Sequence, residues 1–313
     1  MGVEPEAPAR GPSRSIRLRD DEGVADGIRR IASGRAERAL AQLAEANGDG
    51  LAEAIHGARK ELKKMRAILR LSRDGLGGKL FRAENRRYRD SGQLLSVSRD
   101  AEAKLEALAA LGQRFGGEFP GDARRAWAQT LADERDGLAA VAPDRRAPEI
   151  ERAMAMIEAG RDSIPSWPLE GDYWDLIGSG LARSYRQGRS ALKRATADPN
   201  VESIHEWRKR TKDLTYQLRI LVGAWPPLLG ETADQAHELS DLLGDHHDLA
   251  VLANDLSGRD QLDGGRKALQ ALIEKRQVEL LAESLEIGAR LYAEKPIAFN
   301  RRMEAYWSAW RAP

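Results

Sequence analysis

One basic pattern occurs twice in the chain and constrains the fold more than any other feature. The first copy is residues 55–70, IHGARKELKKMRAILR, and the second is residues 204–219, IHEWRKRTKDLTYQLR. Both copies read His-x-x-Arg-Lys-x-x-Lys, and both end on an arginine at the same distance from the histidine. Because a long repeated unit indicates internal duplication, we expect the chain to consist of two similar halves.

On an α-helix, where each residue turns by about 100°, the shared positions fall on one narrow stripe. Relative to His56, the stripe runs from about −60° at Arg59 to about +40° at Lys60. Apolar residues occupy the opposite, core-facing side. The residues assigned to the stripe and its flanks in the two copies are His56, Arg59, Lys60, Lys63, Lys64, Arg66, Arg70, His205, Arg208, Lys209, Lys212, Tyr216 and Arg219.

The simpler alternative is a charged helix face that only meets solvent. Such a face usually mixes signs, so that opposite charges pair four residues apart. Like charges at that spacing instead cost roughly 0.2–0.5 kcal/mol per pair. Because the same single-sign stripe occurs twice, we expect an anionic ligand to offset this cost.

The formal net charge of +1 over 313 residues hides a strong segregation of charge. Residues 56–70 hold six Lys or Arg against Glu61, and residues 183–194 hold five and no acid. This distribution indicates a local anion binder rather than a general polycation. The chain has no cysteine, which excludes disulfides, thiol catalysis and thiolate metal sites and fits a reducing cytoplasm. The chain contains no apolar run of about 20 residues, so no membrane-spanning helix is expected.

The whole chain reads as helical, with no convincing strand. Residues 1–20 are expected to form a disordered tail without a secretory signal. We expect Asp49 and Asp198 to cap the two motif helices, with Pro199 in the first turn of the second. Outside the motif helices, helices are expected at 21–46, 80–111, 122–141, 148–161, 175–195, 231–256, 266–293 and 298–310.

The repeat continues beyond the motif helices. LSVSRD at 95–100 aligns with LGDHHD at 243–248, and the proline-containing stretch 163–171 separates the halves. We therefore divide the chain into a first helical bundle, 21–165, and a second helical bundle, 166–313.

These motifs resemble the CHAD domain, the conserved histidine α-helical domain. HEWRKRTKDLTYQL followed by LSDLLGDHHDLAVL is similar to its second half, and HGARKELKKMRAILR followed by LLSVSRDAEAKL to its first. LARSYRQGRSALKRA also fits the family's pattern. The alternating Glu-x-Glu-x-Lys strand of the triphosphate-tunnel domain, which some members carry, does not occur, so we expect a stand-alone member.

The resemblance implies an all-α fold of two homologous four-helix bundles, related by a pseudo-twofold axis around a shared basic cleft or pore. It implies binding of inorganic polyphosphate and association with polyphosphate granules in the cytoplasm. By position it extends the binding residues to Arg89, Arg99, Arg183, Tyr185, Arg186 and Arg189. Thr215 departs from the pattern, because the first copy has Arg66 there, so we expect the first half to bind more strongly.

The chemistry of the stripe suits a repeating phosphate chain. Arginine can hold two phosphate oxygens with its planar fork, while lysine supplies a mobile point charge. The surrounding cations should lower the pKa of His56 and His205, and bound polyphosphate should raise it again. The alternative is that each histidine only orients or packs. Tyr216 and Tyr185 are similarly open, since each could bind phosphate or cover the lysine stems.

No cofactor or metal is expected. Adjacent histidines such as His246 and His247 point to different faces of a helix, so we do not expect them to bind one metal ion together. We expect Asp245 and Asp248 to pair with arginines or cap helices. The leading hypothesis is non-catalytic polyphosphate binding, with weaker binding of other polyanions and no membrane contact. The alternatives are a nucleic-acid-binding protein, a phosphohydrolase, or a regulator of a polyphosphate-metabolising enzyme.

Overall fold

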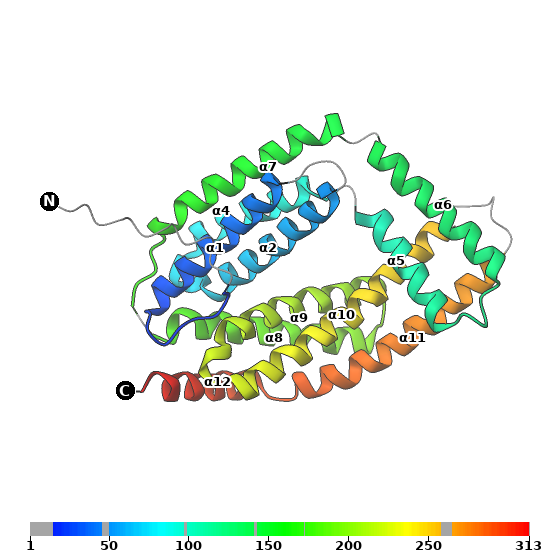
Figure 1. Cartoon of the computed structure of the whole chain (residues 1–313). Helices are drawn as coiled ribbons and strands as arrows, with labels where there is room; N and C mark the ends of the chain where they lie inside the picture. The colour runs from blue at the N-terminus through cyan, green and yellow to red at the C-terminus, as the bar shows by residue number, and fades with distance from the viewer. Residues whose placement is uncertain are drawn as a thin grey trace.

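The computed structural model describes residues 15–45, 50–96, 99–140, 143–171, 173–257 and 265–312. Within these ranges the chain is helical and forms no strand, as predicted (Figure 1). Most of the expected tail and the expected cap Asp49 lie outside the described residues. The relation of the two halves by a pseudo-twofold axis stays a prediction.

Four helices of the first half pack into a bundle. They are α1 (Val24–Ala44), α2 (Leu51–Leu71), α4 (Gly78–Leu94) and α7 (Pro143–Ser163), and α2 is the first motif helix. A single turn, α3 (Arg73–Leu76), joins α2 to α4. Gly77 follows this turn at φ 73°, a left-handed conformation that glycine adopts without a Cβ clash.

The second half forms a neighbouring bundle. It consists of α8 (Asp175–Ala197), α9 (Val201–Leu221), α10 (Pro226–Ser257) and α11 (Arg266–Leu291), and α9 is the second motif helix. The last helix, α12 (Pro296–Arg311), packs against α8. The 3₁₀ turns η2 (Ile164–Ser166) and η3 (Val222–Ala224) follow α7 and α9.

The prediction of one long helix over 80–111 is wrong, because α4 ends at Leu94 and a separate helix, α5 (Arg99–Arg114), follows it. α5 and α6 (Gly121–Ala140) pack against each other, and α5 packs against α10 and α11 (Figure 1). Leu108, Leu111 and Trp127 share a second hydrophobic cluster with residues such as Leu252 and Ile273. In the sequence, the helical spacing of apolar residues continues from α4 into α5. This spacing therefore does not predict which bundle the apolar side of α5 packs against. How the chain divides into domains stays a prediction.

Two helix starts also differ from the prediction. Asn200, not Asp198, caps α9: its Oδ1 accepts from the backbone N–H of Ser203 at 2.9 Å, and the Ser203 hydroxyl lies 3.1 Å from the backbone N–H of Asn200. This is a reciprocal capping box, and the Asp198 carboxylate instead accepts from the Asn200 side-chain amide. α10 begins at Pro226 rather than at the predicted residue 231, because the first turn of a helix needs no proline N–H.

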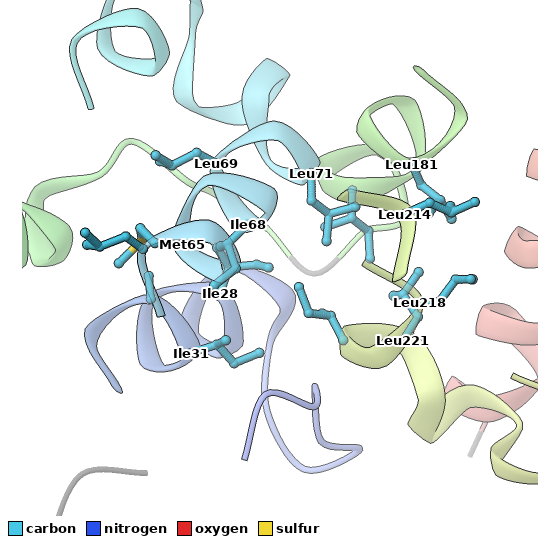
Figure 2. Close-up of a cluster of buried hydrophobic side chains, with 14 of the residues drawn as sticks. Ile28, Ile31, Met65, Ile68, Leu69, Leu71, Leu181, Leu214, Leu218 and Leu221 are labelled. Atoms are coloured by element: carbon cyan, nitrogen blue, oxygen red, sulfur yellow. The ribbon is translucent and has the colours of Figure 1, made fainter. Parts of the chain in front are cut away.

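The two bundles share one continuous core. Figure 2 shows part of it, with labelled side chains from α1, α2, α8 and α9. Gly180 of α8 packs on the backbone of α2, where an added Cβ would lie 1.9 Å from the carbonyl oxygen of Leu71. Gln217 of α9 also donates to the carbonyl of Ala67 in α2 at 3.2 Å. These contacts fix the two motif helices beside each other.

Candidate functional site

A cavity of about 610 Å³ lies where the two motif helices meet. Helices α2 and α9 supply most of its wall, α10 and α4 supply more, and Ala103 brings in α5. We call it the basic cavity. Its described lining residues are Arg59, Lys63, Arg66, Arg70, Arg89, Ala103, His205, Glu206, Arg208, Lys209, Arg210, Lys212, Asp213, Tyr216, His247, Asp248 and Val251.

Arg70 of α2 reaches across to α9. Arg70 Nη1 donates to Oδ1 of Asp213 at 3.0 Å, and Arg210 Nη1 lies 3.9 Å from the second carboxylate oxygen. Burial raises the pKa of Asp213, while Arg70 and Arg210 oppose that shift. Arg66 also lines the basic cavity, and its pKa falls to about 10 because of burial and of the neighbouring Arg70 and Arg89. The guanidinium groups are thus crowded, as the repeated stripe predicts.

His205 faces His247 of α10, and their rings stack with centroids 4.4 Å apart. Burial is the largest of the effects that together lower the pKa of His205 to about 4, and His247, Lys209 and Arg208 contribute the rest. The sequence argument named only the cations as the cause, so it missed the two larger contributions of burial and His247. At neutral pH the ring is therefore uncharged and has one N–H to donate.

Tyr216 brings a hydroxyl to the same wall. Burial raises its pKa to about 12, and the carboxylates of Glu61, Asp241 and Asp213 act in the same direction. The phenol therefore stays protonated at physiological pH and can donate a hydrogen bond to an anion.

Ten of the predicted binding residues line the basic cavity. They are Arg59, Lys63, Arg66, Arg70, Arg89, His205, Arg208, Lys209, Lys212 and Tyr216. His56, Lys60, Lys64 and Arg186 are not among its lining residues. Lys64 instead lies 2.6 Å from the carboxylate of Glu61. The side chain of Arg99 lies outside the described residues.

The other predicted residues hold the fold together. Arg183 pairs with Asp74 at 2.9 Å, Arg189 donates to the carbonyl of Tyr292 at 3.1 Å, and Arg219 pairs with Asp234. Tyr185 is fully buried and stacks on the Phe299 ring at 3.9 Å between centroids. Its hydroxyl donates to the carbonyl of Glu294 at 3.3 Å. Periodicity could not separate these positions from binding residues, because their partners come from distant parts of the chain.

Sequence reasoning missed several residues of the site. Arg210 follows the shared Arg-Lys pair directly, but the first copy has Glu61 there, so the comparison of copies hid it. Glu206 and Asp213 bring carboxylates into the basic cavity, and His247 brings an imidazole that was weighed only as a metal ligand. Asp248, expected to pair with arginines or cap a helix, also lies at the wall.

The described residues contain no group of three or more His, Cys, Asp or Glu side chains placed to hold a metal ion. None of their helices is both long and apolar enough to cross a membrane.

The family model of the CHAD domain matches residues 30–257, a range that includes both motif helices and the lining residues of the basic cavity. The chain belongs to the CHAD family. It is also similar to the crystal structure of the CHAD domain from the plant Ricinus communis, with 19% identity and a TM-score of 0.47. That match covers 96% of this chain and 98% of the plant chain. A comparison with curated proteins finds no match.

Proposed function

We propose that this CHAD protein binds inorganic polyphosphate in the basic cavity and does not cleave it. The observation that carries the proposal is the convergence of cations from both motif helices on one cavity. Of its described lining residues, nine are Lys or Arg and three are Asp or Glu. Such an excess, in a partly buried site, favours a ligand with many closely spaced negative charges.

The form of the site supports a phosphate chain over other anions. Arginines from α2, α4 and α9 offer planar forks for phosphate oxygens, and lysines from α2 and α9 offer mobile charges. The neutral His205 and the protonated Tyr216 can add hydrogen bonds. Donors on several sides match a flexible repeating anion without requiring one register.

Nucleic acid is the main competing ligand. Proteins that bind single strands usually stack bases on aromatic side chains. Among the described residues that line the basic cavity, Tyr216 is the only Phe, Tyr or Trp. This composition favours a ligand without bases. Binding of the same kind would place the protein on polyphosphate granules in the cytoplasm, which we include in the proposal.

The test is a calorimetric titration of the purified protein with polyphosphate at 50 and 200 mM salt, repeated with a single-stranded oligonucleotide as competitor. We expect the affinity to fall by about 10³ or more between the two salt concentrations, as for other polyanions held by six or more cations. Polyphosphate should displace the oligonucleotide, and protein incubated with polyphosphate and Mg²⁺ should release no phosphate. Displacement of polyphosphate by the oligonucleotide, or steady phosphate release, would overturn the proposal.

A further inference from the structure

The two motif helices differ in where they place their acidic residues. Glu61 of α2 aligns with Arg210 of α9, and Lys64 of α2 aligns with Asp213 of α9, so two charges are exchanged between the copies. Glu61 is not among the lining residues of the basic cavity and forms a buried ion pair with Arg35 at 2.9 Å. Asp213 instead lines the basic cavity. The exchange therefore puts a carboxylate inside the proposed anion site.

Asp213 binds the groups that an anionic ligand would need. Its carboxylate accepts from Arg70 at 3.0 Å and lies 3.9 Å from Arg210. The side chains of Asp213 and Arg70 are only 14% and 20% exposed, so solvent screens this pair weakly. A carboxylate and a phosphate present similar oxygen pairs to a guanidinium. Asp213 thus fills the place of one phosphate group at the junction of the two bundles.

We infer that Asp213 is a specificity-determining residue that selects polyphosphate over phosphodiester polyanions. This inference rests on the proposed function of the basic cavity. A ligand that reaches Arg70 must displace the Asp213 carboxylate or accept its repulsion, and either costs binding free energy. Because Asp213 has the same sign of charge as every polyanion, it weakens the binding of all of them. Only the ligand that makes the most compensating contacts still binds tightly, and this difference gives specificity.

Polyphosphate is the ligand that can best offset the binding free energy lost through Asp213. Its neighbouring charged groups share a single bridging oxygen, so several adjacent units can contact the crowded arginines at once. In nucleic acids a sugar separates successive phosphates, so fewer charges reach the same arginines. The penalty from Asp213 is equal for both ligands, but the compensation is larger for polyphosphate.

The test compares dissociation constants for polyphosphate and for a single-stranded oligonucleotide at one salt concentration. Asp213→Asn removes the charge and keeps an oxygen that can accept from Arg70. The matched control is Glu206→Gln, which removes one negative charge from the same helix and the same cavity. Glu206 pairs with Arg210 at 2.6 Å, whereas Asp213 is the residue that accepts from Arg70. Asp213→Glu restores the charge.

We expect Asp213→Asn to strengthen oligonucleotide binding by about tenfold more than polyphosphate binding, which is about 1.4 kcal/mol of lost discrimination. Glu206→Gln should shift both ligands alike, and Asp213→Glu should keep the wild-type ratio. Equal shifts for both ligands in Asp213→Asn would overturn the inference while polyphosphate binding itself persists. Failure of the wild-type protein to bind polyphosphate would instead refute the proposed function. Circular dichroism melting of each variant shows that the comparison is made on folded protein.

Discussion

The imidazole rings of His205 in α9 and His247 in α10 stack at the wall of the basic cavity, with 4.4 Å between their centroids. This contact joins the second motif helix to the DHHD stretch of the next helix. It also explains why the proposed ligand should change the charge of His205. Two imidazoles this close disfavour a proton on either ring, and burial and the nearby cations act in the same direction.

Polyphosphate binding should therefore strengthen as the pH falls. Free His205 has a pKa of about 4 and stays neutral at pH 5.5. Bound phosphate should raise that pKa toward its ordinary value, so the complex holds more protons than the free protein between the two values. For a bound pKa near 6.5, the affinity at pH 5.5 should exceed that at pH 8.5 by up to about tenfold.

Calorimetry in buffers of different ionisation enthalpy measures the proton taken up at pH 5.5. The variant His205→Gln keeps a hydrogen-bonding amide but cannot gain the proton, so it should lose most of the pH dependence. A wild-type affinity that is the same at both pH values would show that His205 only packs or orients its neighbours.

A second prediction concerns the buried ion pair of the first bundle. Arg35 and Glu61 lie 2.9 Å apart with side chains only 3% and 4% exposed. Glu61→Gln leaves the Arg35 charge without its buried counter-ion, so the free energy of unfolding should fall by about 3–5 kcal/mol in urea titrations. The exposed pair of Arg290 and Glu286 gives the control, because Glu286→Gln should change stability by less than about 0.5 kcal/mol.

Replacing both members of the pair separates this explanation from a simple packing defect. The double variant Arg35→Met with Glu61→Leu removes both charges and should recover most of the stability lost in Glu61→Gln. If the double variant were the less stable of the two, the uncompensated charge would not be the cause.

A third prediction concerns Gly180, where α8 packs on the backbone of α2. A Cβ on Gly180 would lie 1.9 Å from the Leu71 carbonyl oxygen, which is backbone and cannot move aside alone. Gly180→Ala should lower the free energy of unfolding by about 1–3 kcal/mol or more and weaken polyphosphate binding by separating α8 from α2. Gly137→Ala is the matched control, since nothing lies within 4 Å of its added Cβ, and it should be neutral or stabilising by up to about 1 kcal/mol. Equal melting temperatures for the two variants would contradict this account of the interface.

The sequence predicted the helical class, the family and the convergence of several repeat residues. The spacing that puts Arg59 and Lys63 on one side of α2 also puts Leu62 and Met65 in the core. This local geometry needs no knowledge of partners, because one helix period decides both faces. The ten predicted residues that line the basic cavity are mostly of this kind.

The remaining features depend on contacts between distant segments. Arg183 and Tyr185 resemble binding residues in the sequence. In the structure, however, Arg183 forms an ion pair with Asp74, and the Tyr185 ring stacks on Phe299. α5 packs against α10 and α11, and the periodicity of α5 does not identify these partners. Asp213 could not be predicted from the positions that the two copies share, because the first copy has Lys64 at the aligned position.

The measurement that most directly tests the central claim is polyphosphate affinity after charge reversal on both motif helices. Arg59→Glu combined with Arg208→Glu places two negative charges at the basic cavity, and binding should weaken by at least about 10³. The control combines Arg125→Glu with Arg290→Glu, which makes the same charge change at exposed positions on α6 and α11, away from the basic cavity. Near-complete loss in the first variant with near-wild-type binding in the second is the predicted result. Equal losses in both variants would contradict the assignment of polyphosphate binding to the basic cavity.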